Sequence, residues 1–274
     1  MDIQRQTFKR GSKTYFNSSL FFPKAVRRDV FALYGFVRVA DDFVDAVPQD
    51  GDGFRAFERE YRRALGGRES DDVIISSFVE LVRRKELETG WVDAFLRSME
   101  MDLEKSTYHS LDETLEYIYG SAEVIGLFMA RIMDLPGESF SYARLLGRAM
   151  QYINFIRDIA EDRSLGRTYL PLAEGELSSL DREEADRHPE AFKRFIAHQL
   201  ERYRAWQREA EAGFRFIPKR YLIPIKTASD MYGWTARKIE ADPFVVYRRK
   251  VKPRRGRIIL RVVRNALLLP APSL

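Results

Sequence analysis

Residues 30–44 read VFALYGFVRVADDFV, and this stretch decides the fold. At about 100° per residue its apolar side chains fall nearly all round a helix, which is typical of a helix buried in a protein core. Four polar side chains nevertheless share one arc of about 60° on that helix, namely Tyr34, Arg38, Asp41 and Asp45. Because an unpaired carboxylate away from water is costly, these two acids require partners.

Asp41 and Asp45 are four residues apart, so their carboxylates point the same way from one helix face. Such a pair offers oxygen ligands to Mg²⁺ while leaving coordination sites for water and substrate. The alternative is an ion pair between Arg38 and these acids where two helices meet. Taken alone, the first aspartate pair is compatible with both interpretations.

A second aspartate pair lies in residues 150–171, MQYINFIRDIAEDRSLGRTYLP. Read as one continuous helix, it places four polar residues on another arc of about 80°, namely Gln151, Asn154, Asp158 and Asp162. The two amides are informative, because a solvated helix face is commonly filled by Lys and Glu. Gln and Asn are short neutral dipoles that can orient phosphate oxygens and metal-bound water. The alternative is an ordinary amphipathic helix with its polar face in water.

Basic and aromatic residues lie near the second pair in sequence. Arg157 and Arg167 offer forked donors that match phosphate oxygens, and Tyr169 in the GRTYLP turn is placed to reach the same site. Surface solvation is the alternative for the arginines.

The rest of the chain predicts an all-α fold. Helical patterns follow one another across all 274 residues, separated by short Gly/Pro/Asp-rich breaks and without the alternation of a sheet. We expect a single domain, residues 1–274, built as a helical bundle around a central cavity. Pro224 should end or kink a helix, with a further helix from Thr227 to about Glu240. With no cysteine and three histidines, a metal site would use oxygen ligands.

The C-terminal part is strongly basic. Residues 243–274 hold nine of the 46 Lys and Arg residues and no acid. The amphipathic tail, residues 253–274, suits peripheral contact with an anionic membrane surface, and the alternative is a closing helix docked by its apolar side. No apolar run is long enough to cross a bilayer and no signal core is present, so we expect a cytoplasmic protein. We expect no nucleic-acid partner.

Four segments together resemble one family: GSKTYFNSSLFFP (11–23), YGFVRVADDFVD (34–45), YIYGSAEVIG (117–126) and QYINFIRDIAEDRSLGRTYLP (151–171). The sequence is similar to the squalene/phytoene synthases, which condense two prenyl diphosphates head to head. The resemblance extends over essentially the whole chain.

The resemblance implies roles for particular residues. Asp41, Asp45, Asp158 and Asp162 would hold Mg²⁺, with Mn²⁺ as a substitute, bridging the substrate diphosphates. Contacts with diphosphate or with the metal shell are implied for Ser12, Tyr34, Arg38, Gln151, Asn154 and Arg157. The prenyl channel would be lined by Tyr117, Ser121, Ala122 and Gly126, and later diphosphate contacts would come from Tyr232 and Arg249. Tyr15 is a candidate aromatic face for a carbocation, with core packing as its alternative.

The implied reaction joins two geranylgeranyl diphosphates to phytoene through a cyclopropylcarbinyl diphosphate. The alternative product is squalene or dehydrosqualene from farnesyl diphosphate, with NADPH needed only for squalene. An alternative of another class is a non-catalytic, membrane-associated helical protein. Glu123 departs from the family pattern, which often has glycine there, so either the channel wall differs or Glu123 faces outward.

Overall fold

The computed structural model describes residues 22–269, and within this range it is built of helices without a named strand, as the sequence predicts. Ser12 and Tyr15 lie outside the described residues. One isolated bridge pairs Thr107 with Thr168. The helices are α3 (Lys24–Asp45), α4 (Gly51–Leu65), α5 (Val73–Arg84), α6 (Thr89–Glu104), α7 (Leu111–Ile118), α8 (Val124–Ile132), α9 (Phe140–Arg157), α10 (Ile159–Ser164), α11 (Arg182–Arg187), α12 (Pro189–Glu211), α13 (Lys219–Ala241), α14 (Val245–Arg248) and α15 (Arg255–Leu268).

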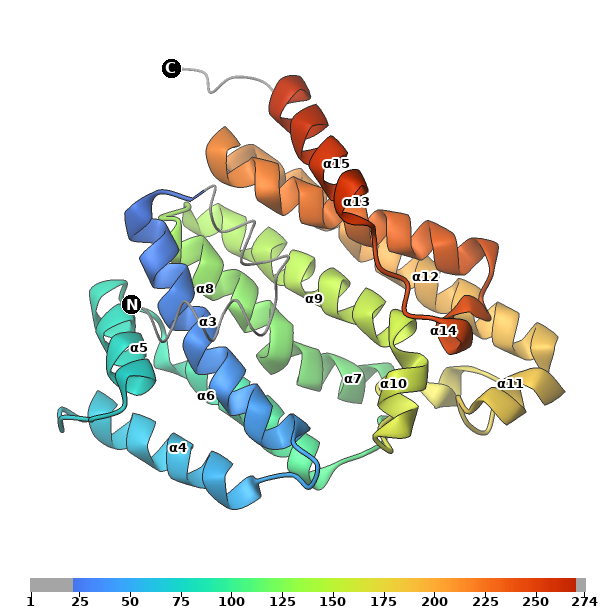
Figure 1. Cartoon of the computed structure of the whole chain (residues 1–274), viewed down its shortest axis with the longest axis horizontal. Helices are drawn as coiled ribbons and strands as arrows, with labels where there is room; N and C mark the ends of the chain where they lie inside the picture. The colour runs from blue at the N-terminus through green and yellow to red at the C-terminus, as the bar shows by residue number, and fades with distance from the viewer. Residues whose placement is uncertain (1–21, 270–274) are drawn as a thin grey trace.

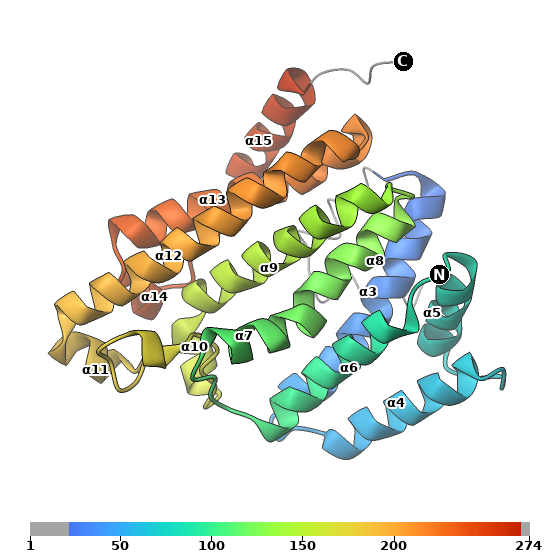
Figure 2. The same ribbon diagram turned by 180° about the vertical axis from the view of Figure 1, so that it is seen from behind.

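The helices form one bundle, which both views show as a stack running from α4 at one side to α15 at the other (Figures 1 and 2). α9 lies in the middle, between α8 on one face and α12 on the other, and α13 separates α12 from α15. A π-helical turn, Tyr119–Glu123, joins α7 to α8, and three 3-10 turns complete the chain at Gly137–Ser139, Leu172–Glu174 and Ala212–Phe216.

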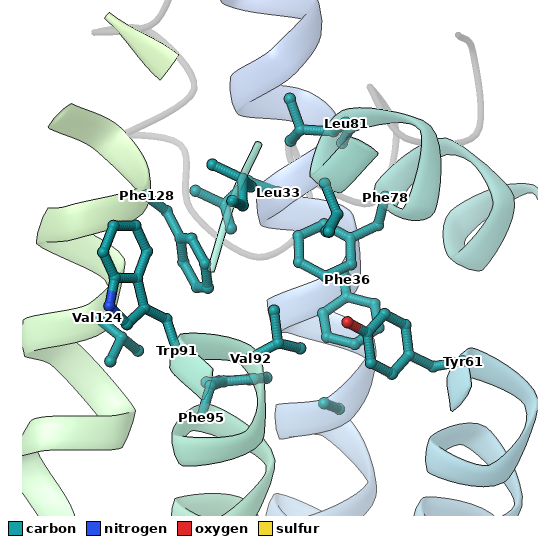
Figure 3. Close-up of a cluster of buried hydrophobic side chains, with 14 of the residues drawn as sticks. Leu33, Phe36, Tyr61, Phe78, Leu81, Trp91, Val92, Phe95, Val124 and Phe128 are labelled. Carbon is teal, nitrogen blue, oxygen red and sulfur yellow. The ribbon is translucent and has the colours of Figure 1, made fainter. Parts of the chain in front are cut away.

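The first core fixes the rotation of α3. Phe36 is fully buried and stacks on Phe78 of α5, with ring centroids 4.0 Å apart, and it also contacts the ring of Tyr61 on α4. Figure 3 shows this aromatic group facing Phe95 of α6 and Phe128 of α8. Because offset aromatic pairs and full burial are both favourable, this face of α3 is held inward.

The second core holds α9 against α12. Ala149, Ile153 and Ile156, which the sequence places opposite the polar line of that helix, are all completely buried. Phe192 and Tyr203 of α12 belong to the same apolar cluster. The polar line of α9 is therefore directed away from α12.

Two local predictions need correction. Pro224 does not end a helix, and no separate helix begins near Thr227, because α13 starts at Lys219 and continues through both to Ala241. Packing of α13 against α9, α12 and α15 keeps the helix continuous in spite of the missing N–H group. The predicted continuous helix through Asp158 is interrupted there, since α9 ends at Arg157 and α10 begins at Ile159.

Candidate active site

The last turns of α3 carry the first aspartate pair. Phe36, Ala40 and Val44 are fully buried at a spacing of four residues, so the arc that holds Asp41 and Asp45 is turned away from the core. The side chains of Asp41 and Asp45 remain 34% and 43% exposed.

Arg38 forms an ion pair with one member of the first aspartate pair, Asp41. Its Nη1 lies 2.8 Å from Oδ2 of Asp41, and its other terminal nitrogen contacts Asp42. The ion pair expected as the alternative interpretation is thus present. Burial nevertheless raises the pKa of Asp41 to about 7, and the nearby charge of Asp45 acts in the same direction. The positive charge of Arg38 lowers this pKa but does not offset burial and the negative charge of Asp45.

The second pair begins at the helix break, with Asp158 at the break and Asp162 one turn beyond it. Asp158 has a bridge-region backbone, with φ −100° and ψ 14°, and its N–H still bonds the Asn154 carbonyl at 2.8 Å. Gln151 and Asn154 therefore precede the break on α9, whereas Asp162 follows it on α10. Asn154 Oδ1 is buried without a hydrogen-bond partner in the part of the chain that the structure describes. An unsatisfied amide oxygen beside an acid suits a ligand donor or cation.

Basic side chains approach Asp158 from two directions. Arg157 Nε donates to Asp158 Oδ1 at 2.9 Å, and Lys250 Nζ lies 3.3 Å from the same oxygen. Lys250 follows α14 and also contacts Glu161. The predicted Arg249 beside it is exposed like Lys250 but forms no ion pair within residues 22–269. Burial raises the pKa of Asp162 to about 8, with the charges of Asp158 and Glu161 adding to the effect.

Arg167 joins the two aspartate pairs. Gly166, with φ +74°, reverses the chain after α10, so that the Arg167 N–H bonds the Asp162 carbonyl at 2.8 Å. Its side chain then reaches α3, donating to Asp45 Oδ1 at 2.9 Å and to the Val44 carbonyl at 2.7 Å. Burial by itself lowers the pKa of this guanidinium, but Tyr169, Asp102 and Asp45 together raise it above its usual range.

Asp102 at the end of α6 is a site residue that the sequence analysis missed. It is buried and accepts hydrogen bonds of 2.7 Å from the hydroxyls of both Tyr117 and Tyr169. Burial raises its pKa, while the Tyr117 hydrogen bond and the charge of Arg167 oppose that shift. A signal was available, because Asp102 continues the apolar line of Trp91 and Phe95 along α6.

A cleft of about 390 Å³ opens at this junction. Asp45, Asp102 and Arg167 all line it, together with Lys105 and Leu165. Figure 1 shows the end of α3 and the end of α10 on the same side of the bundle. Acids and bases from three separate parts of the chain thus share one cleft.

The segment with the implied channel residues contains the π-helical turn. Tyr117 precedes the turn, and Ser121 within it has a buried Oγ without a partner among residues 22–269. Ala122 packs on Gly147 of α9, where an added Cβ would lie 2.3 Å from the Ala122 carbonyl oxygen. Gly126 also faces α9, since a Cβ there would lie 2.2 Å from the Ala143 carbonyl oxygen.

Glu123 does not face solvent. It is 1% exposed and binds two arginines of α9, with Arg144 Nε donating at 2.9 Å and Arg148 Nε at 2.6 Å. Of the two later candidates, Tyr232 is half-buried on α13 and packs against the second core.

No group of three or more His, Cys, Asp or Glu side chains suited to a metal ion occurs within residues 22–269. Each aspartate pair alone supplies two carboxylates, so a bound ion would need further oxygen ligands from water or substrate.

Comparison with known proteins agrees with the expected family. The model of the squalene/phytoene synthase family matches residues 8–257. A 15-cis-phytoene synthase from Pantoea ananas is 29% identical over 86% of this chain and 81% of its own, and one from Enterobacter agglomerans is 31% identical over 84% and 82%. A squalene synthase structure from Alicyclobacillus acidocaldarius superposes with a TM-score of 0.80 at 23% identity, covering 89% of this chain and 94% of that one.

Proposed function

The chain belongs to the squalene/phytoene synthase family, and from this premise we propose that its product is phytoene. Members of this family condense two prenyl diphosphates head to head, and this chain is a prenyltransferase of that type. The choice of phytoene, from two geranylgeranyl diphosphates, is supported by curated relatives named 15-cis-phytoene synthase at up to 31% identity. Squalene and dehydrosqualene synthases are structural neighbours below 25% identity, which supports the shared fold but not their products.

The donor set fits Mg²⁺, or Mn²⁺ in its place. Asp41, Asp45, Asp158 and Asp162 would hold the ions, since hard cations prefer carboxylate oxygens and leave positions for diphosphate. The raised pKa values of Asp41 and Asp162 and the unpartnered oxygen of Asn154 support this assignment. When bound, Mg²⁺ would supply charge neutralisation of the departing diphosphate. NADPH would be required only if squalene were the product.

The residues of the chain have separate tasks in this proposal. Arg157 and Lys250, which reach Asp158, would bind diphosphate oxygens, and Arg38 would do so beside Asp41. Arg167 would hold Asp45 in a fixed orientation. Asp102 orients the Tyr117 and Tyr169 rings through their hydroxyls. Tyr169 is stacked on both Phe155 and Tyr108 and would support the site by packing. Tyr117 is the ring that would stabilise a carbocation without reacting with it. Apolar helices around them would keep water from the cation.

The observation that carries the proposal is the link from the Asp162 carbonyl through Arg167 to the Asp45 carboxylate, which ties the second acidic motif to the first beside the cleft that Asp45 and Arg167 line. A protein in which the aspartates had only local structural roles would not require this convergence. It therefore favours catalysis over the non-catalytic, membrane-associated alternative.

The test is incubation of the purified protein with Mg²⁺ and either geranylgeranyl or farnesyl diphosphate, with and without NADPH, followed by mass analysis of the hydrocarbon. We expect phytoene from the longer substrate without NADPH. Asp158→Ala should abolish product, whereas Asp93→Ala, at an acid half-exposed on α6, should not. Failure to form any head-to-head product would refute the assignment.

We also propose that the enzyme works in the cytoplasm in peripheral contact with a membrane. Its substrates carry prenyl tails and its product is a hydrocarbon, so both partition into lipid. Within residues 22–269 there is no helix long and apolar enough to span a bilayer. The contact would therefore be made at the surface.

A further inference from the structure

The outer side of α15 carries a concentrated apolar surface. Five of the eight large hydrophobic side chains exposed within residues 22–269 belong to this one helix. Ile259, Leu260, Val263 and Leu267 are 63%, 71%, 49% and 78% exposed. At about 100° per residue they occupy an arc of about 100°. We call these four residues the α15 outer face.

The α15 outer face is not the surface by which the helix closes the bundle. α15 packs chiefly on α13, and the residue that it buries there is Asn265. Asn265 Nδ2 donates to Asp230 Oδ2 at 2.9 Å and to Thr227 Oγ1 at 3.1 Å. α15 is thus a closing helix docked on α13, as the alternative expects, but Asn265 forms polar bonds on its inner side and much of its apolar surface points outward.

Arginines border the α15 outer face on both edges. Arg255 and Arg264 fall about 40° beyond its two sides on the helical wheel. Neither forms an ion pair with another residue in the described part of the chain. Long side chains of this kind extend from an apolar stripe to reach the phosphate level of a membrane. An apolar arc bordered by arginines is the pattern of a helix that lies in the membrane interface.

We propose that the α15 outer face docks this protein on an anionic lipid leaflet, with the helix lying in the plane of the surface. A helix of 14 residues is about 21 Å long, too short to cross a hydrocarbon layer of about 30 Å. In both views α15 lies at the outer edge of the bundle, beyond α13 and opposite α4, so the leaflet can approach it (Figures 1 and 2). This inference rests on the proposed use of prenyl substrates but is tested separately from it.

Charge selects lipid over a second copy of the chain. Residues 243–274 contain no acid, so two copies meeting through this face would place arginine against arginine. An anionic leaflet instead complements both edges, because it attracts basic residues near its surface. The apolar side chains would add hydrophobic burial.

Vesicle sedimentation of the full chain tests the surface. The probes are vesicles of phosphatidylcholine alone and vesicles with about one-third phosphatidylglycerol. We expect Leu260→Glu/Leu267→Glu to bind the anionic vesicles at least about tenfold more weakly than the unmodified chain. Val73→Glu, at an exposed apolar residue of α5, is the matched control and should bind normally. Arg255→Gln/Arg264→Gln should lose the preference for anionic vesicles.

Circular dichroism and thermal melting establish that each variant folds. Wild-type binding by Leu260→Glu/Leu267→Glu would overturn the proposal, as would equal loss in Val73→Glu. The proposal would also be overturned if light scattering showed that the unmodified chain is a dimer and that the double variant is a monomer which still binds vesicles. The α15 outer face would then join two copies of the chain. Product formation in detergent micelles tests the proposed function independently of vesicle binding. The double variant should still form product in micelles.

Discussion

Arg167 and Asp45 are 122 residues apart in sequence, yet the guanidinium Nη1 donates a 2.9 Å hydrogen bond to Asp45 Oδ1. The same arginine bonds the Val44 carbonyl through Nη2 and the Asp162 carbonyl through its backbone N–H. One residue thereby sets the end of α3 against the end of α10. The two acidic motifs have a fixed relation before any ligand arrives.

Arg167→Lys should lower kcat about ten- to a hundredfold. A lysine keeps the charge but cannot reproduce the forked contact with both Asp45 and Val44, and a lost charge-assisted hydrogen bond costs about 1.5–3 kcal/mol. Asp45 would then lose its orientation. Steady-state turnover with geranylgeranyl diphosphate measures this.

The matched control is Arg163→Lys. Arg163 lies on α10, four residues before Arg167, but binds Asp181 and Thr168, away from the aspartate pairs. We expect some loss of thermal stability in this variant and turnover within about threefold of the unmodified chain. Equal losses of turnover in the two variants would mean that Arg167 acts only on stability.

Much of this arrangement could be predicted from local pattern. The buried helix at Phe36 and the buried side of α9 at Ile153 follow directly from helical periodicity. So did the grouping of Asp41 with Arg38 on one arc, because it depends on a spacing of three residues within one helix. The family assignment followed from the same motifs.

The rest depends on contacts between distant segments. The helix break at Asp158 has no glycine or proline to mark it, so a periodic sequence read straight through it. Lys250 instead of Arg249 approaches Asp158 because the chain enters from α14 at an angle that the sequence does not specify. Asp102 was missed because its partners, Tyr117 and Tyr169, come from other elements.

Asp102→Asn should destabilise the protein by about 1–3 kcal/mol and reduce turnover. The carboxylate accepts from two phenols at once, whereas an amide offers one oxygen and leaves a buried donor facing the second hydroxyl. Urea unfolding followed by fluorescence measures the first effect. Tyr108→Phe is the control, because the Tyr108 hydroxyl is buried without a partner among the described residues although its ring stacks on Tyr169. A Tyr108→Phe loss as large as that of Asp102→Asn would argue against the hydrogen bonds as the cause.

Lys250→Met should raise the KM for prenyl diphosphate and lower kcat/KM by at least about tenfold. Lys250 is the basic residue of its segment that reaches Asp158, at 3.3 Å, where a substrate diphosphate would compete for it. Arg249→Met removes an equal charge from the exposed neighbour and should change kcat/KM by less than about threefold. The reverse order would restore Arg249 as the diphosphate contact implied by the family resemblance.

Gly147→Ala should unfold the protein or prevent its accumulation. The added Cβ would lie 2.3 Å from the Ala122 carbonyl oxygen, and this backbone atom cannot move without separating α9 from the π-helical turn. Gly233→Ala meets only the end of the Arg237 side chain, at 3.6 Å. In the middle of α13 this control should be stabilising by about 0.5–1 kcal/mol. Normal melting of Gly147→Ala would show that the two helices are not in close contact.

Glu123→Ala should destabilise the protein by about 3 kcal/mol, the lower end for a broken buried ion pair, because Arg144 remains 44% exposed and can recover water. Arg148 has less access to water, at 21% exposed. Its cation–π contact with Trp206, 5.3 Å from the ring centroid, would be left without the balancing acid.

Since Glu123 ends the π-helical turn that follows Tyr117, the loss of Glu123 should also loosen the channel segment and broaden the range of substrate chain lengths that the enzyme accepts. Melting experiments and competition between farnesyl and geranylgeranyl diphosphate measure the two effects. Glu240→Ala, which breaks the exposed pair with Arg204, should cost about 1 kcal/mol or less and leave the products unchanged. Unchanged chain-length selection in a destabilised Glu123→Ala would limit this acid to holding α8 and α9 together.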